Sequence, residues 1–141
     1  MEISKPVIKL SDNFTLSEFL RSRTAVQRDF REQFCPPCNV IDNLLKLVAL
    51  VLQPARVEFQ SWIYVTSGYR CKRLNEAVGG SPNSDHMRGQ AADVTCKDVK
   101  GLYDLILALD LPFYQLIHYR GRNFLHISHR EDDIKKQTWV I

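Results

Sequence analysis

The sequence predicts an α+β domain in which helices pack against a small antiparallel sheet. Two observations lead to this class. Amphipathic segments with a helical period dominate the first half of the chain, whereas short alternating or β-branched segments dominate the second half. The last two of these segments are joined by a short polar loop, which predicts a hairpin and therefore antiparallel pairing.

Length and composition indicate one globular domain spanning residues 1–141, with a core over about 13–130. The net charge of +3 is modest, and Lys and Arg are scattered, so we expect no nucleic-acid partner. No apolar run reaches the length of a membrane span, and residues 1–6 lack a stretch of signal-peptide type. We therefore expect a monomer that is made in the cytoplasm.

The first helix is predicted to begin after Thr15, which can cap it. Glu18 completes a capping box, and Phe14 precedes the cap as an apolar staple. The helix is expected to end near residues 22–24. The highly charged stretch 21–33 is interpreted as a solvated connector with room for a helical turn.

A longer helix is predicted over residues 40–53, because apolar residues recur there at helical spacing. Pro54 is where it should end or bend. Of the remaining segments, 72–78 and 98–109 are predicted to be helical, whereas the predicted strands are 62–66, 91–95, 115–119 and 124–128. The tail from Glu131 is charged and then apolar, and either docks or frays.

Three side chains form a candidate metal site. His86 and Asp93 follow each other closely around the predicted strand 91–95, and His126 lies in the strand 124–128. Two neutral imidazoles and one carboxylate make a three-ligand zinc set that leaves a fourth position for water. Such an open site is typical of hydrolytic rather than structural zinc.

The motifs around these ligands resemble a known family, the zinc DD-peptidases. This family comprises the zinc D-Ala-D-Ala carboxypeptidases and the peptidoglycan endopeptidases, which share a fold with the hedgehog signalling domain. The resemblance covers about residues 13–130 and is strongest for the compact branch common in phages and prophages. It is carried by Ser67-Gly68-Tyr69-Arg70, by Ser84-x-His86-x-x-Gly89-x-Ala91-x-Asp93, by Gln115-Leu116-Ile117 and by Leu125-His126-Ile127-Ser128.

The resemblance implies a Zn²⁺ metallopeptidase that cuts next to a D-amino acid in stem or cross-link peptides of peptidoglycan. It also implies that Arg70 contacts the substrate, holding a carboxylate or steadying the oxyanion; the alternative is a solvated Arg at a helix start. Ser84 is a candidate donor to the substrate or simply a capping residue. Ser128 shares the strand face of His126 and is a third candidate contact.

One element of the family pattern is missing, namely the general-base carboxylate of the hairpin. No Asp or Glu occurs between residues 111 and 128. The resemblance aligns the family's acid at the end of the first hairpin strand with Tyr119, which would more readily donate to an oxyanion. His118 is the other titratable neighbour, and its unperturbed pKa near about 6.5 suits a base.

The length of the hairpin loop decides which of these two residues faces the zinc. A loop of two or four residues pairs Tyr119 with Phe124 and places Tyr119 on the face of His126, whereas a loop of three residues brings His118 opposite His126. We favour His118 as the catalytic base and expect weak turnover.

Two other function classes stay open. The first is a zinc-bearing wall-binding or structural domain of a phage tail or lysis cassette that has lost turnover. The second is a redox or zinc-ribbon protein built on the cysteines, since Cys35 and Cys38 have the two-residue gap of such motifs. A zinc ribbon needs a second such pair, but only the isolated Cys71 and Cys96 remain.

Overall fold

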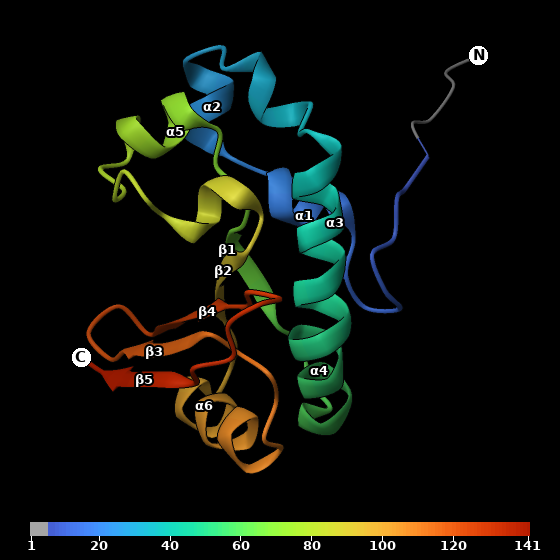
Figure 1. The fold of residues 1–141 in the computed structure, drawn as a ribbon, viewed down its shortest axis with the longest axis vertical. Coiled ribbons are helices and arrows are strands. Elements are labelled where there is room, and N and C mark those ends of the chain that lie inside the picture. Colours follow the sequence, from blue (N-terminus) through green and yellow to red (C-terminus); the bar gives the residue numbers. More distant parts are fainter. Residues whose placement is uncertain (1–5) are drawn as a thin grey trace.

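The computed structural model describes residues 6–141 and has the predicted α+β class, with one five-stranded sheet and helices around it (Figure 1). Within the N-terminal stretch 1–6, for which no signal peptide is predicted, residues 1–5 lie outside the described residues. The strand order is β1-β2-β4-β3-β5. The strands are β1 (Tyr64–Ser67), β2 (Ala91–Thr95), β3 (Gln115–Tyr119), β4 (Phe124–Ser128) and β5 (Gln137–Val140).

The first helix, α1 (Leu16–Leu20), has the predicted cap: the backbone N–H of Thr15 donates to the Glu18 carboxylate at 2.6 Å. The connector that follows is more structured than expected. It holds the short helix α2 (Arg23–Gln27) and the 3₁₀ turn η1 (Arg31–Phe34). Its description as solvated is wrong for Gln33, whose side chain is completely buried.

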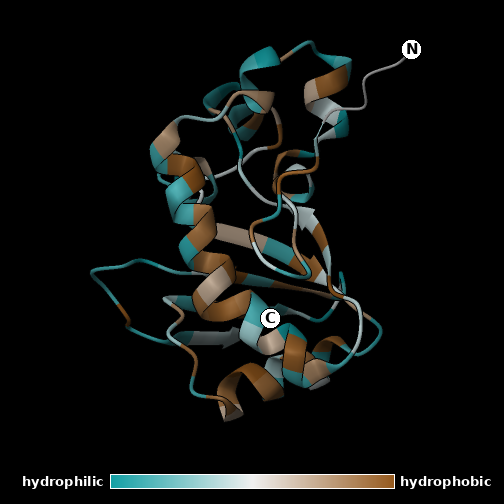
Figure 2. Cartoon of the chain, turned by 90° about the vertical axis from the view of Figure 1, so that its right-hand side faces the viewer, coloured by the Kyte–Doolittle hydropathy of each residue, from teal (hydrophilic) through white to brown (hydrophobic). Residues whose placement is uncertain are grey.

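The long helix does not end at Pro54. It runs through α3 (Cys38–Leu47), the π-helical turn η2 (Val48–Leu52) and α4 (Gln53–Phe59), and Pro54 occupies the first turn of α4. A proline removes one backbone donor, and a π turn just before it changes the bonding pattern at the place where that donor is missing. Figure 1 shows the three parts stacked end to end, and Figure 2 shows apolar residues recurring along them.

The remaining helices frame the sheet. Along the chain, helix α5 (Lys72–Ala77) and the 3₁₀ turn η3 (Asp85–Arg88) come after β1 and before β2, and α6 (Val99–Ala108) follows β2. The fold of the chain places α6 against β3 and β4 on one face of the sheet (Figure 1). Ala92, Leu116, Leu125 and Ile127 point to this covered face and are fully buried.

The C-terminal tail docks as β5, which pairs in parallel with β3. All other pairs in the sheet are antiparallel, so the sheet is mixed rather than purely antiparallel. Within the described residues, no helix is long and apolar enough to cross a membrane.

Candidate metal centre and its groove

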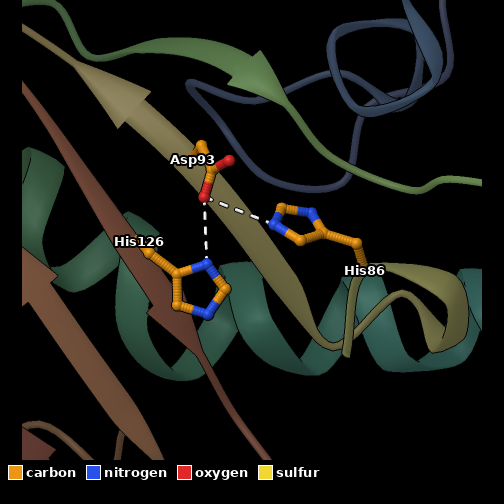
Figure 3. Close-up of side chains that lie close together, drawn as sticks. All are labelled: His86, Asp93 and His126. Atoms are coloured by element: carbon orange, nitrogen blue, oxygen red, sulfur yellow. Dashed lines mark hydrogen bonds and ion pairs between the residues drawn. The ribbon is translucent and has the colours of Figure 1, made fainter. Parts of the chain in front are cut away.

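Three elements bring the predicted ligands together on the face of the sheet opposite α6. Asp93 of β2 lies directly across from His126 of β4, and the turn η3 carries His86 over the same point. Asp93 Oδ1 is 3.3 Å from His86 Nε2 and 3.0 Å from His126 Nδ1. Figure 3 shows both rings directed at this oxygen.

This geometry fits a tetrahedral cation. Zinc lies about 2.0–2.2 Å from nitrogen and oxygen ligands, so tetrahedral ligand atoms are about 3.3–3.5 Å apart. The three donor atoms all lie within 4.8 Å of one another, and the two shorter separations are close to the tetrahedral value. Two imidazoles and a carboxylate also have the donor chemistry that zinc prefers.

The backbone fixes which nitrogen of His86 faces the cluster. His86 Nδ1 is 2.7 Å from the carbonyl oxygen of Gly68, so Nδ1 donates its proton there, and Nε2 is the nitrogen that faces Asp93 and could bind a metal. Gly68 reaches this position because it has no side chain: a Cβ there would lie 2.6 Å from backbone atoms of Phe19. The Ser67–Arg70 motif thus orients a ligand through its glycine.

Arg70 acts on the same cluster from the other side. Its Nε donates to Ser67 Oγ at 3.0 Å and its Nη2 donates to Asp93 Oδ2 at 3.4 Å, which leaves Oδ1 of Asp93 to the histidines. Burial lowers the pKa of Arg70, and the Asp93 carboxylate partly offsets that effect. Arg70 therefore lies beside a ligand and holds its second oxygen.

Asp93 is anionic in this arrangement. Burial by itself would raise the pKa of its carboxyl group, but hydrogen bonds from His126 and His86 outweigh burial and hold the pKa well below its usual range. A cation bound by the three side chains would take the place of the protons that the rings now share with Asp93.

Gln33 supports this motif from beneath, and sequence reasoning missed it. Its amide nitrogen donates to the carbonyl oxygens of Leu20 at 3.0 Å and Tyr69 at 2.8 Å, and its oxygen accepts from Cys71 N at 2.8 Å. All three contacts are buried, so Gln33 ties the backbone on both sides of Arg70 to the N-terminal helices.

A shallow groove of about 280 Å³ lies along the cluster. The loop before η3 forms one wall, and the exposed face of β3 and β4 forms the floor. The lining residues are Ser81, Asn83, Ser84, Asp85, Gln115, Ile117, Tyr119, His126 and Arg130.

An ion-pair cluster around the buried carboxylate of Asp85 lies on one wall of the groove and was also missed. The Asp85 carboxylate pairs with Arg88 and with Arg130, whose Nη2 lies 2.9 Å from Asp85 Oδ1. The Arg130 guanidinium also stacks over the Tyr114 ring, 3.9 Å from its centroid. In the sequence, the only signal for this cluster is the position of Asp85 directly before the candidate ligand His86.

The two serines predicted to contact a substrate have structural partners. Ser84 caps η3 by accepting from His86 N at 3.2 Å, and it also lines the groove. Ser128 is fully buried, and its hydroxyl accepts from Gln115 N at 3.1 Å. Ser84 thus stays within reach of a substrate, whereas Ser128 is enclosed by the protein in this structure.

The hairpin register corrects our preference for His118. The loop has four residues, 120–123, and Tyr119 pairs with Phe124 while Ile117 pairs with His126. His118 therefore points to the opposite face of the sheet, where its ring lies 5.8 Å from that of Tyr103 on α6. Tyr119 faces the groove instead and stacks on Phe124 at a centroid distance of 4.6 Å.

The cysteines take no part in the cluster. Cys35 and Cys38 are exposed, Cys71 and Cys96 are buried, and all four are free thiols. The single candidate metal group found among residues 6–141 contains no cysteine.

Comparison with protein families identifies a relationship for most of the chain. Residues 12–128 match the sequence profile of the family described as Peptidase M15. No curated protein matches the chain significantly. The matched range includes the three clustered side chains, Arg70 and the hairpin, and it ends before β5.

Proposed function

Because the chain belongs to the Peptidase M15 family, we propose that it is a zinc metallopeptidase that hydrolyses a peptide bond next to a D-amino acid in bacterial peptidoglycan. The observation that carries this proposal is the cluster of His86, Asp93 and His126 beside an open groove. The substrates would be stem or cross-link peptides, which can lie extended along the sheet.

When bound, zinc would lower the pKa of a water molecule towards about 7 and polarise the substrate carbonyl. The chain's own residues would hold and orient the reacting groups. Arg70 keeps the Asp93 carboxylate turned towards the histidines. The Tyr119 hydroxyl, which lies on the groove face, would donate to the oxygen of the attacked carbonyl.

We propose Arg130 as a further contact for the substrate. Its Nε and Nη2 are bound to Asp85, and the guanidinium lies on the groove wall with part of its surface exposed. The planar fork of Arg favours carboxylates, which peptidoglycan stems carry. Delivery by a phage or a lysis system would bring the protein to the wall.

A second candidate function is a zinc-bearing domain that binds the wall with little or no turnover. The observation in its favour is the absence of a carboxylate between residues 111 and 128, together with the place of Tyr119 on the groove face. Positioned general bases contribute about 10²–10⁴-fold to rates, so their loss leaves binding intact and chemistry slow.

One experiment separates the two functions. Zinc-loaded protein is incubated with purified peptidoglycan, and both released amines and the fraction of protein that sediments with the wall are followed. Amine release that disappears in His126→Ala supports hydrolysis. Sedimentation with the wall but no amine release, on walls of several chemistries, favours the binding domain. If the protein neither sediments with the wall nor releases amines, both functions are contradicted.

A further inference from the structure

The C-terminal strand β5 extends the floor of the groove beyond the range that the family shares. It pairs in parallel with β3, with Gln115 opposite Gln137 and Ile117 opposite Trp139. The ladder continues past the strand, since Ile141 N donates to the carbonyl oxygen of His118 at 2.9 Å. Trp139 is therefore held at a fixed place beside Ile117.

The side chain of Trp139 lies on the groove face of the sheet. Gln115 and Ile117 line the groove, and paired residues of a parallel ladder point to the same side. A side-chain contact confirms this orientation, because Gln115 Nε2 donates to Gln137 Oε1 at 3.2 Å. Since side chains alternate along a strand, Trp139 is on the same side as Gln137.

Trp139 is 43% exposed despite its size. On the same face, Tyr119 and Phe124 stack on each other, so aromatic side chains lie on this face of β3, β4 and β5. Exposed aromatic surface next to a site is typical of ligand contact, because it offers a large apolar area with few rotatable bonds.

The distance of Trp139 from the metal cluster sets what it can reach. It lies two strands away from His126, in the order β4, β3, β5. With strands about 4.8 Å apart, this separation is about 10 Å. An extended peptide advances about 3.3–3.6 Å per residue, so about three residues of substrate span it.

We propose that Trp139 forms a substrate subsite on β5 that binds the aliphatic side chain of the residue about three positions from the hydrolysed bond. This inference rests on the proposed function, since it takes the metal cluster as the place of the reacting bond. The subsite makes the protein select long stem or cross-link peptides over dipeptides. We take the occupant to be a peptide, because the groove and β5 share one sheet face, and a peptide bound in the groove would extend along this face onto β5.

The direct test is a binding measurement that needs no turnover. The chain has two tryptophans, so Trp62→Phe leaves Trp139 as the only indole. In this variant, a sugar-free cross-linked stem peptide should change the Trp139 emission at a concentration at least about threefold lower than a D-Ala-D-Ala dipeptide does. Equal responses to the two peptides, or no response to either, would overturn the subsite.

A kinetic test uses Trp139→Ala, with Trp62→Ala as the matched control. Trp62 is also an exposed tryptophan, but it precedes β1 at the other edge of the sheet. Trp139→Ala should lower kcat/KM on the long peptide about threefold to tenfold and leave the dipeptide unchanged, while Trp139→Phe restores most of the loss. Equal loss on both peptides would contradict the subsite.

Two alternative occupants appear as distinct outcomes. If the sugar-bearing muropeptide alone loses affinity in Trp139→Ala, the surface binds glycan and the peptide proposal is wrong. If wild type sediments as a dimer and Trp139→Ala as a monomer, the surface around Trp139 joins two copies of the chain. This outcome also overturns the peptide subsite. Binding of the long peptide without hydrolysis supports the subsite while contradicting the proposed activity, so the two failures are distinguishable.

Discussion

The two ends of the groove differ in how firmly the fold holds their side chains. At the metal end, His86 is buried and bonded to Gly68 O, and Asp93 has partners at both oxygens. At the hairpin end, Tyr119 is only partly buried, and its ring is held by stacking on Phe124. The candidate metal ligands are thus held by several directional contacts, whereas the ring of Tyr119, for which we propose a catalytic role, is held by stacking on Phe124.

This difference separates the two properties that we propose for the domain, namely metal binding and substrate turnover. A substitution at the hairpin end changes few buried contacts, so the fold tolerates it. A substitution at the metal end leaves buried polar groups without partners, which costs about 1–3 kcal/mol for each group. The carboxylate that the family resemblance leads us to expect is absent from the hairpin end, whereas all three candidate ligands are present at the metal end.

The largest expected effect comes from removing a ligand at the metal end. Wild type should retain about one zinc per chain after dialysis, and His86→Ala and His126→Ala should retain almost none, because two protein ligands do not make a stable zinc site. Metal analysis of the dialysed proteins measures this. The control is His129→Gln, which removes a buried histidine whose Nδ1 contacts Pro112 O, and it should keep its zinc. Unchanged zinc in both alanine variants would contradict the site.

The next effect is a gain at the hairpin end. Tyr119→Glu places a carboxylate at the position where the family resemblance expects the acid, on the groove face beside His126. Turnover of Tyr119→Glu on peptidoglycan should exceed that of Tyr119→Gln, which lacks the same hydroxyl, by about 10²-fold or more, since a positioned base contributes about 10²–10⁴-fold. The control is Tyr119→Gln, which has the same shape as the Glu variant but no charge. Equal rates for the two variants at full zinc occupancy would show that a carboxylate here does not act as the base.

The same contrast explains how much the sequence could predict. Local patterns gave the bounds of β2, β3 and β4 and the cap of α1, because alternation and capping depend on neighbouring residues. The His86, Asp93 and His126 group could also be proposed from residue type and order. Both inferences need little knowledge of long-range packing.

Other features depend on contacts that no local pattern encodes. Gln33 lies in a charged stretch, yet its three partners belong to residues 13 to 38 positions away. The preference for His118 rested on the suitability of imidazole as a base and required a three-residue loop. The observed loop has four residues, and this register puts the His118 ring on the other face of the sheet. The parallel pairing of β5 was missed because the charged segment before it does not resemble a strand.

A smaller effect on zinc affinity is expected from a substitution at Arg70, which contacts the candidate ligand Asp93 and is also a candidate contact for the substrate. Arg70→Lys keeps the charge but cannot bridge Ser67 and Asp93 with two directed donors. The zinc Kd should weaken about 10–100-fold, as is typical when a residue that orients a ligand is lost. Chelator competition measures it, with Arg73→Lys as the control, since Arg73 pairs with Glu32 on the surface. An unchanged zinc Kd would limit Arg70 to contact with the substrate.

The smallest effect is expected at His118, where the structure and our preference from the sequence disagree. His118→Phe keeps a planar ring against Tyr103 and removes the titrating nitrogen atoms. Because His118 lies on the face of the sheet away from His126, turnover should stay within about twofold of wild type, below the 10²–10⁴-fold that a base supplies. The pH–rate profile should keep its shape. A loss of about 10²-fold with zinc and thermal stability unchanged would restore His118 to the mechanism, and it would require the hairpin to shift its register by one residue during catalysis.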